Sequence, residues 1–320
     1  MSARHSLASL QVARPPVAHT FRHFQAAVLA TARYEAGLRG NAARMRSRGA
    51  TVVDQDQSEE AFCLSPATPL LPPLAIVGGM GALAGATAFR QACLRFGNSR
   101  TVVLYQACGI PDRSTIIAGA RGPDAPSCRE MASRLADAVR QAVSIVGPAE
   151  RPVRCIIACN SAHYFLPLLE AELRRTERQW SRDVQIVSLV QSSVEALVRL
   201  GCRRTLLLAT EGARVGRIFS APLRDAGIAF DEPSPSQSQL LMRVIFEGVK
   251  ALHEQRAVEL GNAFFEAVVE AGRDYDCLLA GCSEIPLLLD LLRGRGNAAA
   301  AGFLDRVKMV DPVEEALGRV

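Results

Sequence analysis

The segment CLLAGCSEIPLLL, residues 277–289, runs a short apolar stretch into Cys282 and follows it with a serine and a glutamate. A similar segment, CIIACNSAHYFLPLLE at residues 155–170, runs an apolar stretch into Cys159 and then begins a Leu-rich region. A short apolar run that leads through small residues into a helical pattern is typical of a buried strand followed by a helix. The two segments therefore predict two strand–turn–helix units, each with a cysteine at the end of its strand.

The same alternation continues outward from these two segments. Short apolar runs predict buried strands at 74–79, 101–106, 153–159, 184–190, 204–210, 276–282 and 307–311. Apolar residues at helical spacing predict helices at 126–146, 163–176, 190–200 and 237–252. Because the strand runs are continuously apolar, we expect helices on both faces of each sheet and therefore parallel sheets. The predicted fold class is α/β.

The pattern repeats between the two halves of the chain. LAIVGGMG at 74–81 and TLLLATEG at 205–212 are each a strand that runs into small residues, and each precedes its cysteine strand. The repeat predicts two pseudo-symmetric α/β lobes, lobe 1 from 74–184 plus 305–320 and lobe 2 from 185–304. Ligands of parallel α/β sheets bind beyond the carboxyl ends of the strands. Both cysteines are therefore expected in one cleft between the lobes.

Composition and charge narrow the class of protein. The chain has 320 residues, 49% of them hydrophobic and 22% charged, which is ordinary for a soluble globular protein. Of the net charge of +5, residues 1–50 carry +7 (eight arginines against Glu35), so the rest carries −2 and does not suggest a nucleic-acid partner.

Residues 1–73 are expected to be a basic extension, either flexible or a targeting or secretion segment. The chain contains neither a bilayer-spanning apolar run nor a signal peptide, so a cytoplasmic location without membrane partners is expected.

The nine cysteines have no framework spacing, which predicts reduced thiols in a cytosol. Cys155 with Cys159, and Cys277 with Cys282, do not have the usual spacing of zinc ligands, so we expect no metal site. Cys155 and Cys277 are interpreted as buried strand residues. The remaining two cysteines, at the strand ends, are the candidates for chemistry.

Cys159 and Cys282 are each expected where a strand ends and a helix begins. Backbone N–H groups and the helix dipole favour an anion there, which lowers the pKa of a thiol and suits a substrate carboxylate. Asn160, Ser161 and Ser283 are residue types that often cap helices. Two facing thiols can remove a proton from one face of a carbon and deliver one to the other, which inverts the carbon without a cofactor.

Pyridoxal phosphate would be the alternative route, and it needs a lysine for its Schiff base. The chain holds only Lys250 and Lys308, and neither lies in a segment that resembles a cofactor-anchoring loop. A cofactor-free reaction is therefore expected.

Several motifs occur in order over three quarters of the chain. They are GGMG at 78–81, IPDRS at 110–114, ACNSAH at 158–163, LLATEG at 207–212, FEGVK at 246–250 and GCSEIPLL at 281–288. On these motifs, residues 74–320 resemble the aspartate/glutamate racemase family, and most closely its aspartate racemase branch.

The resemblance implies a two-lobed, cofactor-independent homodimeric enzyme that racemises acidic amino acids. It implies that Cys159 and Cys282 are the acid/base residues, and that Arg113 and Lys250 bind substrate carboxylates. The other substrate-binding candidates are Met80, Gly81, Asn160, Ser161, Ser283 and Glu284. It also implies that the C-terminal strand and helix return to lobe 1.

Some positions depart from the family pattern, and these keep other functions open. Ala82 replaces a proline, Ser114, Ser161 and Ser283 replace threonines, and Ala213 replaces a threonine expected to line the cleft. The substrate could instead be a hydantoin, a maleate-like diacid or a broader set of amino acids, or the chain could be an inactive binding or effector protein.

The roles of single residues are open in the same way. Arg113 could cap a turn, and Lys250 could lie in solvent near a helix end and interact favourably with the helix dipole. Glu284 could be an ordinary first-turn helix acid, or it could orient the thiol or the substrate ammonium. His163 could pack in the core or tune Cys159.

Overall fold

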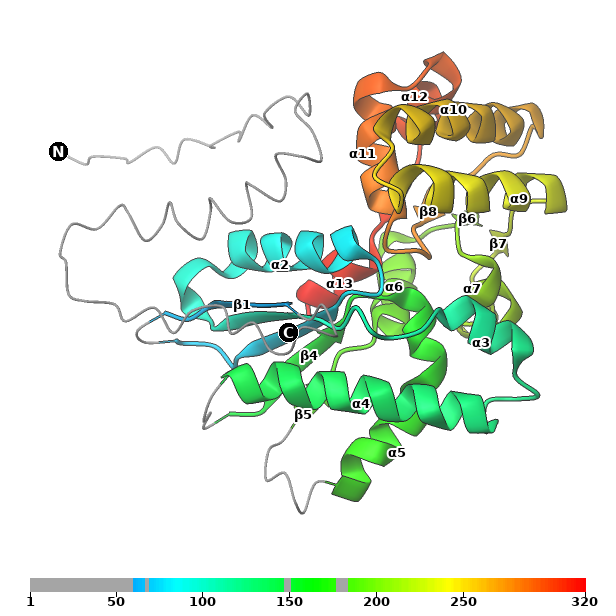
Figure 1. Ribbon diagram of the computed structural model, residues 1–320. Helices are drawn as coiled ribbons and strands as arrows, with labels where there is room; N and C mark the ends of the chain where they lie inside the picture. The colour runs from blue at the N-terminus through cyan, green and yellow to red at the C-terminus, as the bar shows by residue number, and fades with distance from the viewer. Residues whose placement is uncertain (1–59, 67–68, 147–150, 177–183) are drawn as a thin grey trace, which may run out of the picture.

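The computed structural model describes residues 60–66, 69–146, 151–176 and 184–320. Most of the predicted basic extension, residues 1–59, lies outside the described residues. Within them, helices and strands alternate and build two lobes, one around each of two sheets (Figure 1). The prediction of an α/β fold with parallel strand pairs flanked by helices is confirmed.

The strands form two separate sheets. Among the described residues the first sheet has the order β1-β3-β2-β4-β5, and the second has the order β7-β6-β8-β9. The strands of the first sheet are β1 (Glu60–Leu64), β2 (Leu74–Gly78), β3 (Val102–Gln106), β4 (Val153–Ile157) and β5 (Val184–Ile186). Those of the second are β6 (Thr205–Leu207), β7 (Phe230–Asp231), β8 (Cys277–Leu279) and β9 (Lys308–Val310).

The helices connect these strands and cover the sheets. The α-helices of the first half are α2 (Ala82–Phe96), α3 (Arg113–Gly119), α4 (Pro126–Val146), α5 (Leu166–Thr176) and α6 (Leu189–Leu200). Those of the second half are α7 (Glu211–Val215), α8 (Ser220–Asp225), α9 (Pro235–Arg243), α10 (Glu254–Glu270), α11 (Ile285–Arg295), α12 (Ala298–Leu304) and α13 (Pro312–Leu317). The described residues also include the 3₁₀ segments η1 (Gly97–Ser99) and η2 (Asn160–Phe165) and the π-helical segment η4 (Val244–Val249).

Strand β2 illustrates why the strand runs are continuously apolar. Leu74 and Ile76 pack in a cluster with residues of α2 and α13, whereas Ala75 and Val77 pack in a cluster with residues of α4. All four side chains are fully buried, since α2 and α4 lie on opposite faces of the first sheet (Figure 1). Both faces of the strand therefore exclude water, as parallel strands require.

Strand β1 corrects two of the predictions. It pairs antiparallel with β3, so the first sheet is mixed, and it lies in the segment that was predicted to be outside the fold. Phe62 and Leu64 pack against the cluster that contains Leu74. The folded part of the chain therefore begins before Leu74.

The C-terminal strand corrects the predicted lobe boundaries. Strand β9 pairs with β8 in the second sheet, not with the first lobe as predicted. Only α13 returns to lobe 1, where Val313 and Leu317 belong to the hydrophobic cluster that contains Leu74. Strand β5 lies in the first sheet up to Ile186, so lobe 1 also extends past residue 184.

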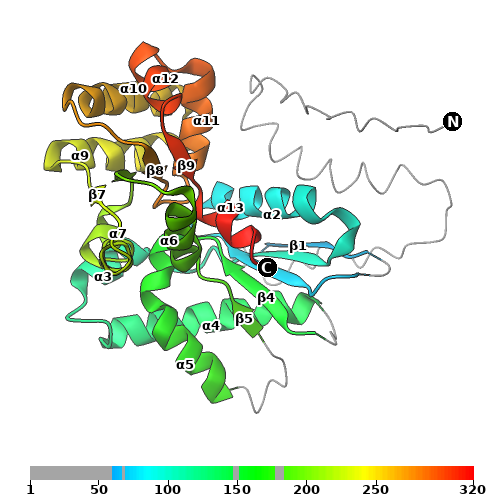
Figure 2. The same ribbon diagram turned by 180° about the vertical axis from the view of Figure 1, so that it is seen from behind.

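Helices α6 and α13 lie together where the two lobes join (Figure 2). Arg199 on α6 donates to Glu315 on α13 at 2.7 Å, and Arg319 forms an ion pair with Glu195. The junction thus combines apolar packing with ion pairs on its exposed side.

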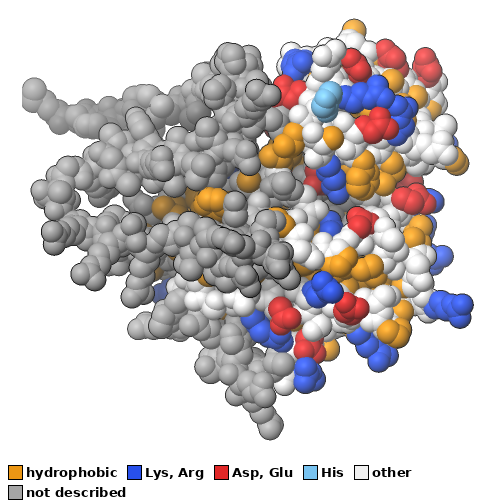
Figure 3. Space-filling model, viewed as in Figure 1, with side chains coloured by type: hydrophobic (Ala, Val, Ile, Leu, Met, Phe, Trp, Pro, Cys, Tyr) orange, Lys and Arg blue, Asp and Glu red, His pale blue; other side chains and the backbone are white. Residues whose placement is uncertain are grey.

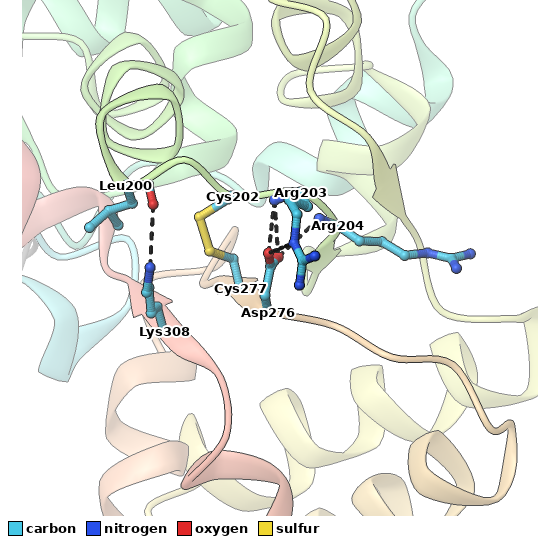
Figure 4. The surroundings of a disulfide bond; sticks show 7 residues. All are labelled: Leu200, Cys202, Arg203, Arg204, Asp276, Cys277 and Lys308. Atoms are coloured by element: carbon cyan, nitrogen blue, oxygen red, sulfur yellow. Dashed lines mark hydrogen bonds and ion pairs between the residues drawn. A yellow bond between two sulfur atoms is a disulfide. The ribbon is translucent and has the colours of Figure 1, made fainter.

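A disulfide joins Cys202 to Cys277, which corrects the prediction of reduced thiols. Cys202 precedes β6 and Cys277 begins β8, so the bond lies at the amino ends of two paired strands (Figure 4). Asp276 accepts hydrogen bonds from the backbone N–H groups of Arg203 and Arg204, both at 2.9 Å. The pairing was missed because the two cysteines are 75 residues apart in sequence and meet only through the tertiary fold.

The described part of the face in Figure 3 carries charges of both signs. On the described part of the face in Figure 3, Lys and Arg side chains are interspersed with Asp and Glu side chains. None of the helices in the described ranges has the length and apolar character needed to cross a membrane.

Candidate active site

Residues of both lobes line one cavity. Apart from Lys250, its lining residues lie in segments that follow the carboxyl ends of strands, as the topology of parallel sheets predicts. Lobe 1 supplies Met80, Asp112, Arg113, Ser114, Cys159, Asn160 and Ser161, and lobe 2 supplies Thr210, Lys250, Cys282, Ser283 and Glu284. The two candidate cysteines thus lie in the same cavity, one from each lobe.

Cys159 is fixed through its backbone. It follows β4 in extended conformation and begins η2, and its carbonyl is 3.0 Å from Nδ1 of His163. The backbone N–H of Leu189 donates to Nε2 of His163 at 3.0 Å, so the proton of the neutral ring is on Nδ1, which donates to Cys159. Burial lowers the pKa of His163 to about 4. Neutral His163 therefore anchors the loop of Cys159 and the start of α6, which favours its packing role.

Cys282 follows β8 and is hydrogen-bonded to a carboxylate. Its Sγ donates to Oε2 of Glu284 at 3.0 Å, and both residues are buried. Burial and the Glu284 charge raise the pKa of Cys282 well above its ordinary value, against the opposing charge of Lys250. The expectation that a helix N-terminus would lower the pKa of this thiol is therefore wrong, because desolvation outweighs the dipole.

Asn160 and Ser161 do not cap a helix. Their side chains form hydrogen bonds with residues of lobe 2. Asn160 Nδ2 donates to the carbonyl of Ala280 at 3.3 Å, and the hydroxyls of Ser161 and Thr210 are 3.2 Å apart. Oδ1 of Asn160 is buried and has no hydrogen-bond partner among the described residues. A buried acceptor without a partner is costly, so this oxygen is suited to an N–H or O–H group of a ligand.

Ser283 is not a cap either. Its hydroxyl donates to Oε2 of Glu284 at 3.2 Å, and no side chain caps α11. Glu284 therefore accepts from two neighbouring donors in its own loop.

Arg113 lines the cavity but holds the loops of lobe 1 together. Its Nη2 donates to the carbonyl of Met80, and its Nη1 donates to that of Pro111 at 2.9 Å. The side chain is buried, and of its three nitrogens Nε is the one left without a partner by the residues that the structure describes. The guanidinium is therefore already engaged by backbone, which differs from the free bidentate carboxylate donor that the sequence predicts.

Lys250 is the more available cation of this cavity. It follows η4, is partly buried and lies with its Nζ 4.6 Å from the centre of the Phe246 ring. In the described ranges it forms no salt bridge, while its charge opposes the rise in the pKa of Cys282 and contributes to the lowered pKa of Asp112. An anionic ligand group would therefore meet the Lys250 ammonium first.

Comparison with known proteins matches the sequence to a family. The family model of the Asp/Glu/hydantoin racemases matches residues 100–319. The chain belongs to this racemase family. Solved structures that share the fold include an aspartate racemase from Picrophilus torridus, which is 20% identical with a TM-score of 0.53 and covers 75% of this chain and 89% of that one.

Two further racemase-like structures are similar in the same way. An aspartate racemase homologue from Pyrococcus horikoshii is 17% identical over 78% of this chain and 97% of that one, with a TM-score of 0.52. A putative Asp/Glu racemase from Yersinia pestis is 16% identical over 77% and 96%, with a TM-score of 0.54. At these identities the similarity concerns the fold and leaves the substrate open.

The racemase-family cavity contains three residues that the sequence-based site omitted. Asp112 and Ser114 flank Arg113 in the IPDRS motif, and Thr210 lies in LLATEG, so membership of a motif was the available signal. Of the predicted site residues, Gly81 is outside the cavity lining and instead abuts Glu284. Ala213 is buried behind the lining, and its backbone N–H donates to the hydroxyl of Thr210 at 3.3 Å.

Proposed function

We propose that this racemase-family protein interconverts the L and D enantiomers of aspartate or glutamate without a cofactor. Cys159 and Cys282 would be the two proton-transfer groups. The observation that supports this most is the meeting of one buried cysteine from each lobe in one polar cavity.

The reaction follows from two thiols on opposite sides of one carbon. A thiolate on one side takes the α-proton, and the thiol on the other side gives its own proton to the opposite face. The reverse reaction exchanges the roles of the two cysteines. Neither step needs an electron acceptor or a Schiff base.

The cavity offers partners for each charged group of an acidic amino acid. The Lys250 ammonium and the hydroxyls of Ser283 and Thr210 suit carboxylates, whereas Oδ1 of Asn160 and the carboxylate of Asp112 suit an ammonium group. A substrate with two carboxylates and one ammonium uses both sets, which favours aspartate or glutamate over alanine.

A second candidate is a related racemase that acts on a neutral ring such as a hydantoin. The engagement of Arg113 by the carbonyls of Met80 and Pro111 favours it, because it removes one cation from the carboxylate-binding set. The proton chemistry of the two cysteines would be the same.

Incubation in deuterated water tests both candidates. A panel of L-amino acids and L-configured hydantoins is incubated with the protein, with and without aminooxyacetate to block pyridoxal chemistry. The proposal predicts loss of optical activity and α-deuterium in aspartate or glutamate, unaffected by aminooxyacetate. Deuterium in hydantoins alone would support the second candidate, and deuterium in no compound would support a binding protein.

A further inference from the structure

Glu284 reaches from lobe 2 across the cleft to the first lobe. A Cβ atom placed on Gly81 would lie 1.7 Å from Oε1 of Glu284, so any side chain at position 81 would collide with the carboxylate. Gly81 is the N-cap of α2, and because glycine has no side chain, no side chain caps the N-terminus of this helix. The carboxylate therefore lies against the positive end of a 15-residue helix.

The other oxygen of Glu284 holds the Cys282 thiol. Oε2 accepts from Sγ of Cys282 at 3.0 Å and from the hydroxyl of Ser283 at 3.2 Å. Glu284 itself is buried to 3% exposure. With one oxygen against Gly81 and the other shared by two donors, Glu284 is oriented toward the thiol more than toward the ligand space.

The two thiols of the cavity have different surroundings. The charged or titratable groups that line the cavity with Cys282 are Glu284, Lys250 from the end of η4, Asp112 and Arg113 from the start of α3, and Cys159. Within the described part of the chain, no carboxylate is hydrogen-bonded to the Cys159 thiol. A thiol that donates to a carboxylate keeps its proton, since loss of the proton would place two negative charges side by side.

We propose that Glu284 is a positioning residue that keeps the proton on Cys282, so that in the ligand-free protein Cys282 is the acid and Cys159 is the base. The catalytic meaning of this asymmetry rests on the proposed racemase function, but the asymmetry itself belongs to the protein alone. Gly81 is part of the device, because only glycine at this position leaves room for the carboxylate.

The asymmetry cannot be read from catalytic efficiency in the two directions. The equilibrium constant between enantiomers is one, so kcat/KM for the two directions must be equal at every pH. The thiols themselves must be measured. Only the thiolate is alkylated, and each unit of pKa changes the thiolate fraction about tenfold below the pKa.

The experiment measures alkylation of each cysteine in the full chain from pH 6 to pH 10. The protein is treated with iodoacetamide without substrate, and mass spectrometry of the digested protein quantifies the peptides of Cys159 and Cys282. In the wild type, Cys159 should be alkylated at lower pH than Cys282. Glu284→Gln, which keeps the shape and removes the charge, should move the Cys282 midpoint down by about one unit or more and leave the Cys159 midpoint in place.

A second variant addresses the position of the carboxylate. Gly81→Ala displaces Glu284 and should also lower the Cys282 midpoint, whereas Gly119→Ala, where a Cβ meets nothing within 4 Å, should not. An unchanged Cys282 midpoint in a folded Glu284→Gln or Gly81→Ala protein overturns the proposal, as does a wild type in which Cys282 is alkylated at lower pH than Cys159. Because alkylation is measured without turnover, its result does not depend on whether the protein is active as a racemase.

Discussion

The side chain of Asn160 donates to the carbonyl of Ala280 at 3.3 Å, and this hydrogen bond joins the lobes beside both cavity cysteines. Asn160 directly follows Cys159, and Ala280 lies two residues before Cys282. The distance between the two thiols therefore depends on a contact that belongs to neither lobe alone.

Asn160→Ala should consequently reduce activity more than stability. One lost hydrogen bond costs about 1 kcal/mol of unfolding free energy, whereas a displaced thiol costs on the order of 10²-fold in kcat/KM. Steady-state kinetics and urea unfolding measure the two effects. Exposed Asn98 supplies the control variant Asn98→Ala, which should change neither. Full activity in Asn160→Ala would show that this contact does not position the thiols.

The two cations of the cavity should respond differently to removal. Lys250→Met should raise KM for aspartate roughly tenfold, equivalent to about 1.4 kcal/mol of binding free energy, and affect alanine little. Lys308, the other lysine of the chain, donates to the carbonyl of Leu200 at 3.3 Å and gives the control Lys308→Met.

Arg113→Met should instead lower the melting temperature and reduce activity toward every substrate, because its guanidinium holds the loops of Met80 and Pro111. Thermal melts and a two-substrate comparison decide this. A selective loss of aspartate activity at unchanged stability would return Arg113 to the carboxylate-binding role predicted from sequence.

Parts of this architecture were predictable from local patterns, and parts were not. The helix 126–146 and the strands around Cys159 and Cys282 were predicted because their burial is continuous or periodic along the chain. Strand β1 was missed because EAFCL is short and stands between polar and Pro-rich segments. The engagement of Arg113 and the raised pKa of Cys282 depend on groups that the fold brings together, which no local pattern encodes.

The disulfide should stabilise the second lobe without controlling the cavity. Cross-linking residues 75 apart removes unfolded-state entropy worth about 4 kcal/mol. Cys202→Ser should therefore melt at lower temperature, while racemisation at 25 °C stays near that of the wild type, because the bond lies at the opposite end of β8 from Cys282. A reductant should lower the melting temperature of the wild type and of the control Cys63→Ser, but not that of Cys202→Ser. An equal response of all three proteins would mean that this bond does not form.

His163 should make stability depend on pH. Its pKa is lowered to about 4 in the folded protein, below the ordinary value of 6.5, so the unfolded chain binds the proton more readily. The contribution of the neutral His163 ring to the free energy of unfolding is fully present above pH 6.5. Up to about 3 kcal/mol of it is lost as the pH falls from 6.5 toward 4.

A second group opposes this effect. Burial raises the pKa of Asp311 to about 6, so its contribution grows as the pH falls. The test is therefore the difference in unfolding free energy between the wild type and His163→Gln, measured in urea from pH 4 to pH 7. The difference should shrink toward low pH, and a constant difference would contradict the assigned ionisation.

The most direct test of the two-thiol account compares Cys159→Ala with Cys282→Ala in deuterated water, using each enantiomer of aspartate separately. The account predicts that racemisation falls at least about 10³-fold in both variants, since an obligatory proton transfer is lost. Each variant should still introduce deuterium into one enantiomer through its remaining cysteine, and the two variants should prefer opposite enantiomers. Racemisation near the wild-type rate in either variant would contradict the account.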